Sequence, residues 1–246
     1  MLESPDMAFP HRDPVKLYLA SNSPRRKELL SLTGLEFTLL PAQVDETPMA
    51  GENGVEYVKR IAHTKALAAT QKLGSEAVII TADTAVVDNY QRENAEILGK
   101  PADQKAAVAM LRNLRGHVHQ VFTAIQIMHT GTGKATSDLC ATSVPMRNYN
   151  DEEIENYVAS GDPLDKAGAY AIQHAGFHPV EGLSGCFANV MGLPLCHLTR
   201  TLAILDITPP KDVPRACQAA LGYNCPVYQL ILTSPPTELP LDRLIR

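Results

Sequence analysis

The order of apolar and polar residues predicts alternating strands and helices in the first half of the chain. Apolar runs over residues 16–20 and 77–82 are typical of buried strands, and residues 84–87 continue the second run. Apolar side chains recur at helical spacing over residues 25–33 and 54–73. Strands and helices that alternate in this way indicate an α/β fold.

The second half continues this mixture and adds a long hairpin. Helical spacing returns over residues 103–114, and acidic residues open a shorter helix over 151–159. The stretches 117–128 and 135–144 flank a turn rich in glycine and threonine, and they predict a β-hairpin. A last helix is expected over residues 193–205. Together these elements predict an α/β fold with a mixed sheet.

Prolines set both ends of the chain apart from the rest. Residues 1–15 hold three prolines among charged residues, which predicts a flexible leader without the apolar stretch of a signal peptide. Beyond about residue 206, seven prolines interrupt every candidate element. The segment 206–246 is therefore expected to be an extended appendage without chemistry, and deletion from about Pro209 onward is expected to leave activity intact.

Composition and charge restrict the classes of partner. Of the 246 residues 45% are hydrophobic, and the formal net charge of -5 comes without a basic stripe for nucleic acid. The five cysteines are widely spaced and form no CxxC pair, which predicts reduced thiols and a cytoplasmic protein. No apolar run approaches the roughly 18 residues of a membrane span. Neither nucleic acid nor a membrane is an expected partner.

The first candidate for chemistry is the segment Ser21 to Arg26, SNSPRR. A strand ends there and a helix begins, with Ser23 able to cap the helix and Pro24 in its first turn. Free backbone N–H groups at a helix N-terminus favour an anion, and Arg25 and Arg26 add bidentate phosphate contacts. The pattern predicts a phosphate site, although a capped surface helix with solvated arginines has the same sequence.

Two charged residues stand where apolar side chains are expected. Lys65 continues the apolar stripe of the helix over 54–73, so its ammonium group pairs, binds a ligand or extends along its stem to solvent. Asp83 follows an apolar strand, and strand ends are where sites form in open α/β sheets. With Asp45 and Glu46, it supplies the hard oxygen ligands that magnesium prefers, although an aspartate that caps a turn would look the same.

Several other polar residues carry weak signals on their own. Lys100 stands in a Gly-Lys-Pro loop, and Gln173 ends the stretch LDKAGAYAIQ over 164–173. Ser184 lacks the GxSxG turn of the serine hydrolases. Four scattered histidines are expected to be structural or solvated: His63, His117, His119 and His174.

Seven longer motifs follow one another along the chain. They are LASNSPRRKELL (19–30), VDET (44–47), ADTAV (82–86), GKP (99–101), HQVFTAI (119–125), DPLDKAGAYAIQ (162–173) and NVMGLPL (189–195). Taken together they resemble the Maf family of nucleotide pyrophosphatases, and the resemblance predicts a Maf-like domain over residues 16–205. It implies an elongated mixed β-sheet flanked by helices, with two lobes around a phosphate-binding cleft.

The resemblance also implies a reaction and roles in it. The residues that would hold a nucleoside triphosphate are Ser21, Arg25, Arg26, Lys65 and Lys100. The residues that would take part in catalysis are Asp83, Glu46, Lys65 and Lys100. Glu46 and Asp83 would act around a divalent cation, Mg²⁺ or Mn²⁺, with Asp83 as the base for an attacking water. Cleavage between the α- and β-phosphates places charge on the pyrophosphate leaving group, which the cations stabilise.

Thr84 and Gln173 bear on the choice of base. The subgroup of the family that acts on dTTP and UTP resembles this chain at both positions, whereas the subgroup that acts on 7-methyl-GTP tends to carry Gln and Glu. A glutamine amide offers a donor and an acceptor to the edge of uracil or thymine, while glutamate only accepts. The resemblance therefore implies dTTP and UTP as substrates. Residues 174–184 depart from the commoner family pattern and leave 7-methyl-GTP as the alternative.

Other classes of function stay open at this point. The family name implies a regulator of cell division or septum formation that binds a partner, and a nucleotide sensor without turnover is a third hypothesis. The retained set of charged residues at Arg25, Arg26, Lys65, Asp83 and Lys100 favours an enzyme. The sequence leaves a homodimer open.

Overall fold

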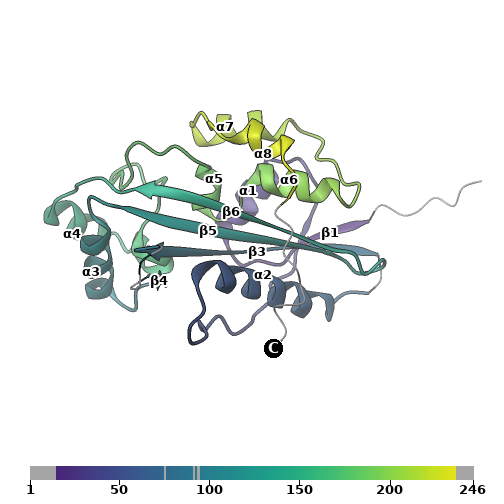
Figure 1. The fold of residues 1–246 in the computed structure, drawn as a ribbon, viewed down its shortest axis with the longest axis horizontal. Helices are drawn as coiled ribbons and strands as arrows, with labels where there is room; N and C mark the ends of the chain where they lie inside the picture. The colour runs from purple at the N-terminus through teal and green to yellow at the C-terminus, as the bar shows by residue number, and fades with distance from the viewer. Residues whose placement is uncertain (1–14, 75, 91, 93–94, 237–246) are drawn as a thin grey trace, which may run out of the picture.

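The chain folds around one mixed β-sheet with helices on both faces (Figure 1). The computed structural model describes residues 15–74, 76–90, 92 and 95–236. The leader expected over residues 1–15 lies outside the described residues except for Val15. The sheet and its helical layers confirm the predicted α/β class.

Six strands make up the sheet. They are β1 (Lys16–Leu19), β2 (Thr38–Leu39), β3 (Ala77–Asp88), β4 (Glu96–Leu98), β5 (Val118–His129) and β6 (Ala135–Pro145). Their order is β2-β1-β3-β5-β6, with β4 paired to β3. β1 runs parallel to both β2 and β3, whereas the other pairs are antiparallel. The predicted mixed sheet and the β5–β6 hairpin are confirmed.

Helices cover the sheet on its two faces and at one end. They are α1 (Pro24–Ser31), α2 (Gly54–Thr70), α3 (Gln104–Leu114), α4 (Asp151–Ala159), α5 (Phe187–Met191), α6 (Leu195–Ala203), α7 (Val213–Leu221) and α8 (Tyr228–Thr233). Two short 3₁₀ helices, Asp162–Asp165 and Ala167–Ala169, follow α4. In Figure 1, α2 lies on one side of the sheet and α5 to α8 on the other, while α3 and α4 group at one end of the long strands.

The central strand β3 does not end at Asp83. Its pairing with β5 continues through Asp83 opposite Ala124 and on to Val87 opposite Gln120. The prediction that the apolar strand stops at Asp83 is therefore wrong, whereas its expected continuation over residues 84–87 is confirmed. A strand carries this charged residue in its middle because Lys65 of α2 lies against its carboxylate, at 2.7 Å between Nζ and Oδ1.

One edge of β3 has a gap in its pairing. β1 pairs with β3 from residue 77 to residue 80, and β4 pairs with the same edge from residue 86 to residue 88. Among the described residues, no strand pairs with residues 81–85 on that edge. Side chains on both faces of β3 can reach this gap, because successive strand residues point to opposite faces.

Two apolar clusters lie on either side of the gap. The first joins β1, α1, α5 and α6 to the start of β3 and includes Leu19, Leu30 and Ile80. The second joins α3 and α4 to the far end of β3 and includes Val86 and Leu111. The gap thus lies between two separately packed lobes, as the family resemblance implied.

Of the segment 206–246, residues 237–246 lie outside the described residues, and the described part is not an extended appendage. It forms α7 and α8, and Val213 of α7 is buried in the same apolar cluster as Leu198 and Leu202 of α6. The prolines do not prevent this, because Pro214 occupies the first turn of α7, where a helix tolerates proline. The expectation that prolines break every element in this segment is wrong.

An arginine of α6 connects the hairpin to the end of α8. Arg200 donates two hydrogen bonds to the fully buried carboxylate of Asp138, at 2.6 and 2.9 Å. Its third nitrogen donates to the carbonyl oxygens of Ile231 and Ser234. Residues 213–234 are therefore tied to the sheet by both apolar and polar contacts.

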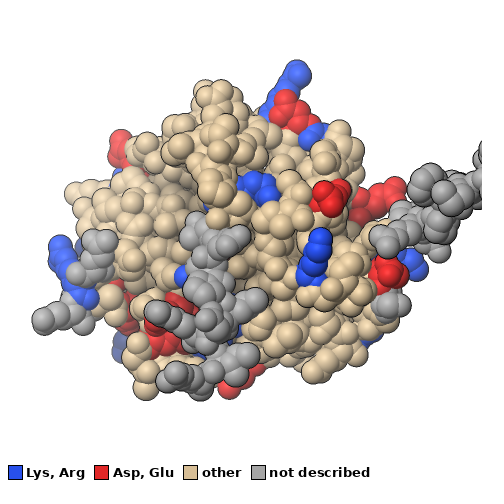
Figure 2. All heavy atoms as spheres, turned by 45° about the vertical axis from the view of Figure 1, so that its right-hand side comes forward, with Lys and Arg blue, Asp and Glu red and all other residues tan. Residues whose placement is uncertain are grey.

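The helices and the surface charges bear on whether the chain binds a membrane or nucleic acid. Within the described part of the chain, no helix is long and apolar enough to cross a bilayer. On the face drawn in Figure 2, the lysines and arginines of the described residues are scattered among acidic and uncharged side chains. All five cysteines are free thiols, in agreement with the prediction from their spacing.

The packing of α8 predicts that substitutions at two adjacent residues change the free energy of unfolding by different amounts. Ile231 is 9% exposed and Leu230 is 69% exposed. Ile231→Ala is expected to lower the free energy of unfolding by about 2 kcal/mol, because it leaves a cavity against α6. Leu230→Ala, the matched control, is expected to change it by less than about 0.5 kcal/mol. Equal effects in urea unfolding experiments would show that α8 does not pack on the domain.

Candidate active site

The gap in β3 opens into a cleft of about 360 Å³. Its lining comes from the turn between β1 and α1, from α1, α2, β3 and α5, from the loops after β2 and β4, and from the segment around the two 3₁₀ helices. All nine residues to which the family resemblance gave a role line it: Ser21, Arg25, Arg26, Glu46, Lys65, Asp83, Thr84, Lys100 and Gln173. The fold thus brings together residues that are far apart in the chain.

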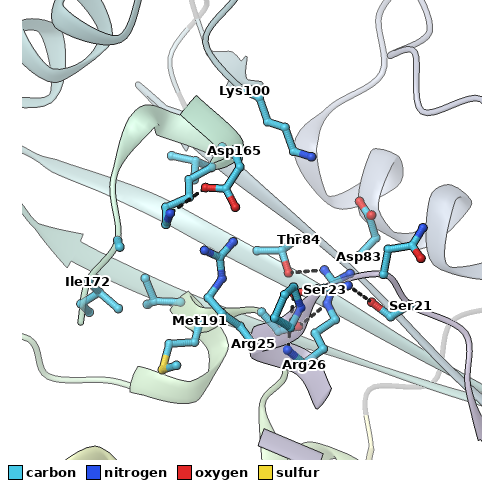
Figure 3. Close-up of a pocket in the computed structure, with 18 of the residues that line it drawn as sticks. Ser21, Ser23, Arg25, Arg26, Asp83, Thr84, Lys100, Asp165, Ile172 and Met191 are labelled. Carbon is cyan, nitrogen blue, oxygen red and sulfur yellow. Dashed lines mark hydrogen bonds and ion pairs between the residues drawn. The ribbon is translucent and has the colours of Figure 1, made fainter. Parts of the chain in front are cut away.

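The N-terminus of α1 forms the cationic end of the cleft. Ser23 caps the helix by accepting a hydrogen bond from the backbone N–H of Arg26, at 3.4 Å, and Pro24 occupies the first turn. The Ser21 hydroxyl accepts from the backbone N–H of Ser23 at 3.2 Å, which fixes the turn from β1 into α1. Figure 3 shows Arg25 extending into the cleft from the start of this helix. Backbone dipoles and guanidinium groups therefore favour an anion at the same place.

Arg26 is held from two sides. Its Nε donates to the carbonyl oxygen of Gly192 at 2.8 Å, and its Nη2 donates to the hydroxyl of Thr84 at 3.0 Å. Gly192 has φ +110°, and a Cβ atom there would lie 3.4 Å from both Arg26 Nε and Thr84 Oγ1. Glycine therefore allows the close approach that the first of these hydrogen bonds needs.

Lys65 pairs with two carboxylates at once. Its Nζ lies 2.7 Å from Asp83 Oδ1 and 2.7 Å from Glu46 Oε1. The Lys65 and Asp83 side chains are 9% and 7% exposed, whereas the Glu46 side chain is 52% exposed. Of the alternatives left by the sequence, pairing is therefore correct and extension to solvent is not.

The surroundings of Asp83 change its acidity. Burial raises the pKa of the Asp83 carboxyl above its ordinary value of 3.8, while the positive charges of Lys65 and Arg26 act in the opposite direction. A carboxylate with a raised pKa is a stronger base than an ordinary one. The raised pKa therefore favours proton uptake by Asp83.

Lys100 approaches from the opposite lobe. It is exposed in the loop between β4 and α3, and its side chain extends into the cleft in Figure 3. The backbone N–H of Gly168 donates to the carbonyl oxygen of Gly99 at 3.1 Å, which holds this loop against the 3₁₀ segment. The ammonium group of Lys100 thus faces the cations of α1 across the cleft.

The remaining wall is largely apolar. Ile172, Val190 and Met191 line it, and Gln173 adds one exposed amide. An apolar wall with one donor and acceptor pair is suited to a flat heterocycle.

Lys166 and Asp165 also line the cleft, although the sequence did not single them out as site residues. Lys166 is 7% exposed, and its Nζ lies 2.6 Å from Asp165 Oδ1 and 3.0 Å from Asp162 Oδ1. Their presence in the motif DPLDKAGAYAIQ was the only available signal.

Asp45 and the four histidines considered above do not line the cleft. His119 is buried, donates to or accepts from the Tyr170 hydroxyl at 2.8 Å, and has its pKa lowered to about 3 by burial. His117 pairs with Asp88 at 2.9 Å. The Asp45 carboxylate accepts from the backbone N–H of Thr47 at 2.9 Å, as expected of a residue that caps a turn. Asp45 therefore does not join Glu46 and Asp83.

Comparison with known proteins decides the family. The sequence model of the Maf family, described as Maf-like protein, matches residues 16–205. The chain belongs to the Maf family.

Relatives of this Maf-family chain carry informative names. A protein of Dechloromonas aromatica (strain RCB) named dTTP/UTP pyrophosphatase is 40% identical over 203 residues, which are 79% of this chain and 100% of that protein. A protein of Thermoanaerobacter sp. (strain X514) with the same name is 44% identical over 184 residues, 75% of this chain and 93% of that protein.

A solved structure gives a weaker likeness. That structure, of a nucleoside-triphosphatase / dITP/XTP pyrophosphatase from Mycobacterium abscessus, is 15% identical. It covers 77% of this chain and 98% of that chain, with a TM-score of 0.39. The family assignment rests on the sequence matches alone.

The carboxylates of this Maf-family cleft fit a divalent cation that is shared with a phosphate ligand. Among the described residues, no group of three or more His, Cys, Asp or Glu side chains could hold a metal by itself. Magnesium is often bound by one or two carboxylates together with substrate phosphates and water. Glu46 and Asp83 converge on one point, since both lie 2.7 Å from Lys65 Nζ. They are the residues that would hold such an ion.

The pairing of Lys65 predicts a shift in the titration of Asp83. The Lys65 charge favours the ionised carboxylate, so Lys65→Met is expected to raise the pKa of Asp83 further above 3.8. Lys59→Met removes a charge from the same helix outside the cleft and is expected to leave this pKa unchanged. The measurement is a ¹³C NMR titration of the Asp83 carboxyl carbon. A parental pKa below 3.8, or equal values in the parent and Lys65→Met, would contradict this account.

Proposed function

We propose that this protein hydrolyses dTTP and UTP to the nucleoside monophosphate and pyrophosphate. The observation that carries the proposal is the convergence of Arg25, Arg26 and Lys100 on one cleft that also holds a buried carboxylate. The names of the relatives at 40% and 44% identity support the same substrates.

The cations would bind the triphosphate and stabilise the charge that develops on it. Arg25 and Arg26 lie at the N-terminus of α1, and Lys100 faces them from the other lobe. Breaking the bond between the α-phosphorus and its bridging oxygen leaves negative charge on pyrophosphate. Groups that are already oriented towards this charge lower the barrier without further reorganisation.

Asp83 would take the proton of the attacking water. The water oxygen forms a bond to the α-phosphorus, its proton passes to the Asp83 carboxylate, and pyrophosphate leaves. Lys65 favours the ionised form of Asp83, because its positive charge opposes the rise in the Asp83 pKa that burial causes. A divalent cation held by Glu46 and Asp83 would add positive charge next to the phosphates.

Gln173 would select the base. Its exposed amide can donate to one polar atom of uracil or thymine and accept from another, while Ile172 and Met191 pack against the ring. The alternative substrate is 7-methyl-GTP, whose purine base would have to bind against the same amide. The free thiols support a reducing compartment, and we place the enzyme in the cytoplasm on that basis.

A panel of nucleotides tests the proposed function. Pyrophosphate release is measured for the eight common NTPs and dNTPs and for 7-methyl-GTP, with Mg²⁺ or Mn²⁺. We expect the highest kcat/KM for dTTP and UTP. Preference for 7-methyl-GTP would overturn the base assignment. Binding of dTTP without release of pyrophosphate would instead identify a nucleotide sensor, and binding of none of these nucleotides would favour the partner-binding hypothesis.

Replacement of Asp83 separates turnover from binding. Asp83→Asn keeps the shape of the side chain but removes its charge, so kcat is expected to fall by on the order of a hundredfold or more. The dTTP affinity is expected to persist, because the cations of the cleft remain. Pyrophosphate release and calorimetry in one buffer with Mg²⁺ measure both quantities. A variant that turns over dTTP at the parental rate would remove Asp83 from the mechanism.

Lys100 is expected to contribute one charged contact. Lys100→Ala should lower kcat/KM by on the order of tenfold or more, the scale of a lost contact of about 1.5–3 kcal/mol. Lys105→Ala removes an exposed lysine of α3 that does not line the cleft, and it is expected to leave kcat/KM unchanged. Steady-state kinetics that show no difference between the two variants would exclude Lys100 from the site.

A further inference from the structure

A chain of hydrogen bonds runs from Arg26 into the interior of the domain. The first bond is that from Arg26 Nη2 to Thr84 Oγ1, at 3.0 Å. The Thr84 and Thr123 hydroxyl oxygens lie 2.9 Å apart, and Thr123 Oγ1 donates to the backbone carbonyl oxygen of Asn189 at 3.2 Å. The chain therefore links α1, β3, β5 and α5.

The direction of each bond in this chain follows from counting protons. A backbone carbonyl can only accept, so the Thr123 proton is used on Asn189. The proton between the two hydroxyls must then come from Thr84. The Thr84 oxygen in turn accepts from Arg26, which can only donate. The Thr84 hydroxyl therefore has no proton left for a nucleotide base or a phosphate.

Asn189 anchors both hydrogen bonds of the Arg26 guanidinium. It is completely buried, and its side-chain amide donates to the carbonyl oxygen of Val121 at 2.9 Å and to Thr142 Oγ1 at 3.0 Å. These bonds fix α5 on β5 and β6. The backbone N–H of Gly192, at the end of α5, donates to the Asn189 carbonyl at 2.9 Å, and the Gly192 carbonyl accepts from Arg26 Nε.

We propose that Asn189, Thr123 and Thr84 are positioning residues that orient the Arg26 guanidinium towards the phosphates. On this account the Thr84 hydroxyl affects the substrate through Arg26 and donates no hydrogen bond to the base. An arginine has five N–H donors, and two are used inside the protein, so three remain to face the cleft in a fixed plane. The proposal rests on the proposed function only for its kinetic readout.

Thr123 offers the cleanest test because it is fully buried and does not line the cleft. Thr123→Val keeps the shape but removes the hydroxyl, and we expect dTTP kcat/KM to fall by about three- to tenfold, the scale of one hydrogen bond. Thr123→Ser restores the hydroxyl and is expected to recover most of this loss. Thr81→Val is the matched control, since Thr81 is a buried threonine of β3 whose hydroxyl donates to the Ala62 carbonyl at 2.7 Å.

A double-mutant cycle with Arg26→Ala decides whether the effect passes through Arg26. If Thr123 acts only by orienting Arg26, Thr123→Val should cause no further loss in the Arg26→Ala protein. Equal losses in both backgrounds, or a loss as large in Thr81→Val, would overturn the proposal. The same cycle is measured by calorimetry with inorganic pyrophosphate as the probe. A parent that binds pyrophosphate but does not turn over dTTP would contradict the proposed function and leave this cycle interpretable.

Thr84→Val provides a second, independent readout. A residue that acts through Arg26 should lower kcat/KM by one common factor for dTTP, UTP and dCTP, because these share the triphosphate. A residue that reads the base should change the ratios between them. Unchanged ratios with a uniform loss support the proposal, whereas altered ratios would contradict it.

Discussion

The ion pair between Lys65 and Asp83 is the contact on which the rest of the cleft depends. A carboxylate in the middle of a buried strand is costly unless a cation lies against it. Lys65 provides this cation from α2, and α2 lies in place because its apolar stripe packs on β3 and β5. The same contact keeps the Asp83 pKa from rising as far as burial alone would raise it. The packing of α2 on the sheet thus affects the pKa of Asp83 in β3.

The gap in the pairing of β3 makes this carboxylate accessible. β1 ends after four residues and β4 begins six residues further along β3, so Asp83 and Thr84 have no strand on that side within the described residues. Asp83 points to the face covered by α2, and Thr84 points to the face covered by α1 and α5. The cleft therefore receives a carboxylate from one face of the sheet and a fixed arginine from the other.

Local patterns in the sequence predicted much of this fold, and long-range contacts account for the rest. The periodicity that predicts α2 and the turn that predicts the β5–β6 hairpin depend on neighbouring residues, and both elements are confirmed. The break expected at Asp83 was wrong, because a charged residue interrupts the apolar run and its partner Lys65 is remote in sequence. The number of prolines after residue 206 misled as well, since Pro214 lies in the first turn of α7.

The candidate site shows the same division. The order of the motifs along the chain predicted nine site residues, and all nine line one cleft. The sequence could not show that Arg26 is held by Gly192 and Thr84, because these partners meet only after α1, β3 and α5 have packed together. Nor could it show that Asn189 lies at the base of this arrangement, since a buried asparagine and an exposed one look alike in a sequence.

The position of water attack tests the central claim most directly. The enzyme hydrolyses dTTP in H₂¹⁸O with Mg²⁺, and mass spectrometry locates the label in the products. Attack at the α-phosphorus predicts one ¹⁸O atom in dTMP and none in pyrophosphate. Label in pyrophosphate, or formation of dTDP and inorganic phosphate, would contradict the mechanism assigned to Asp83 and the cations of the cleft.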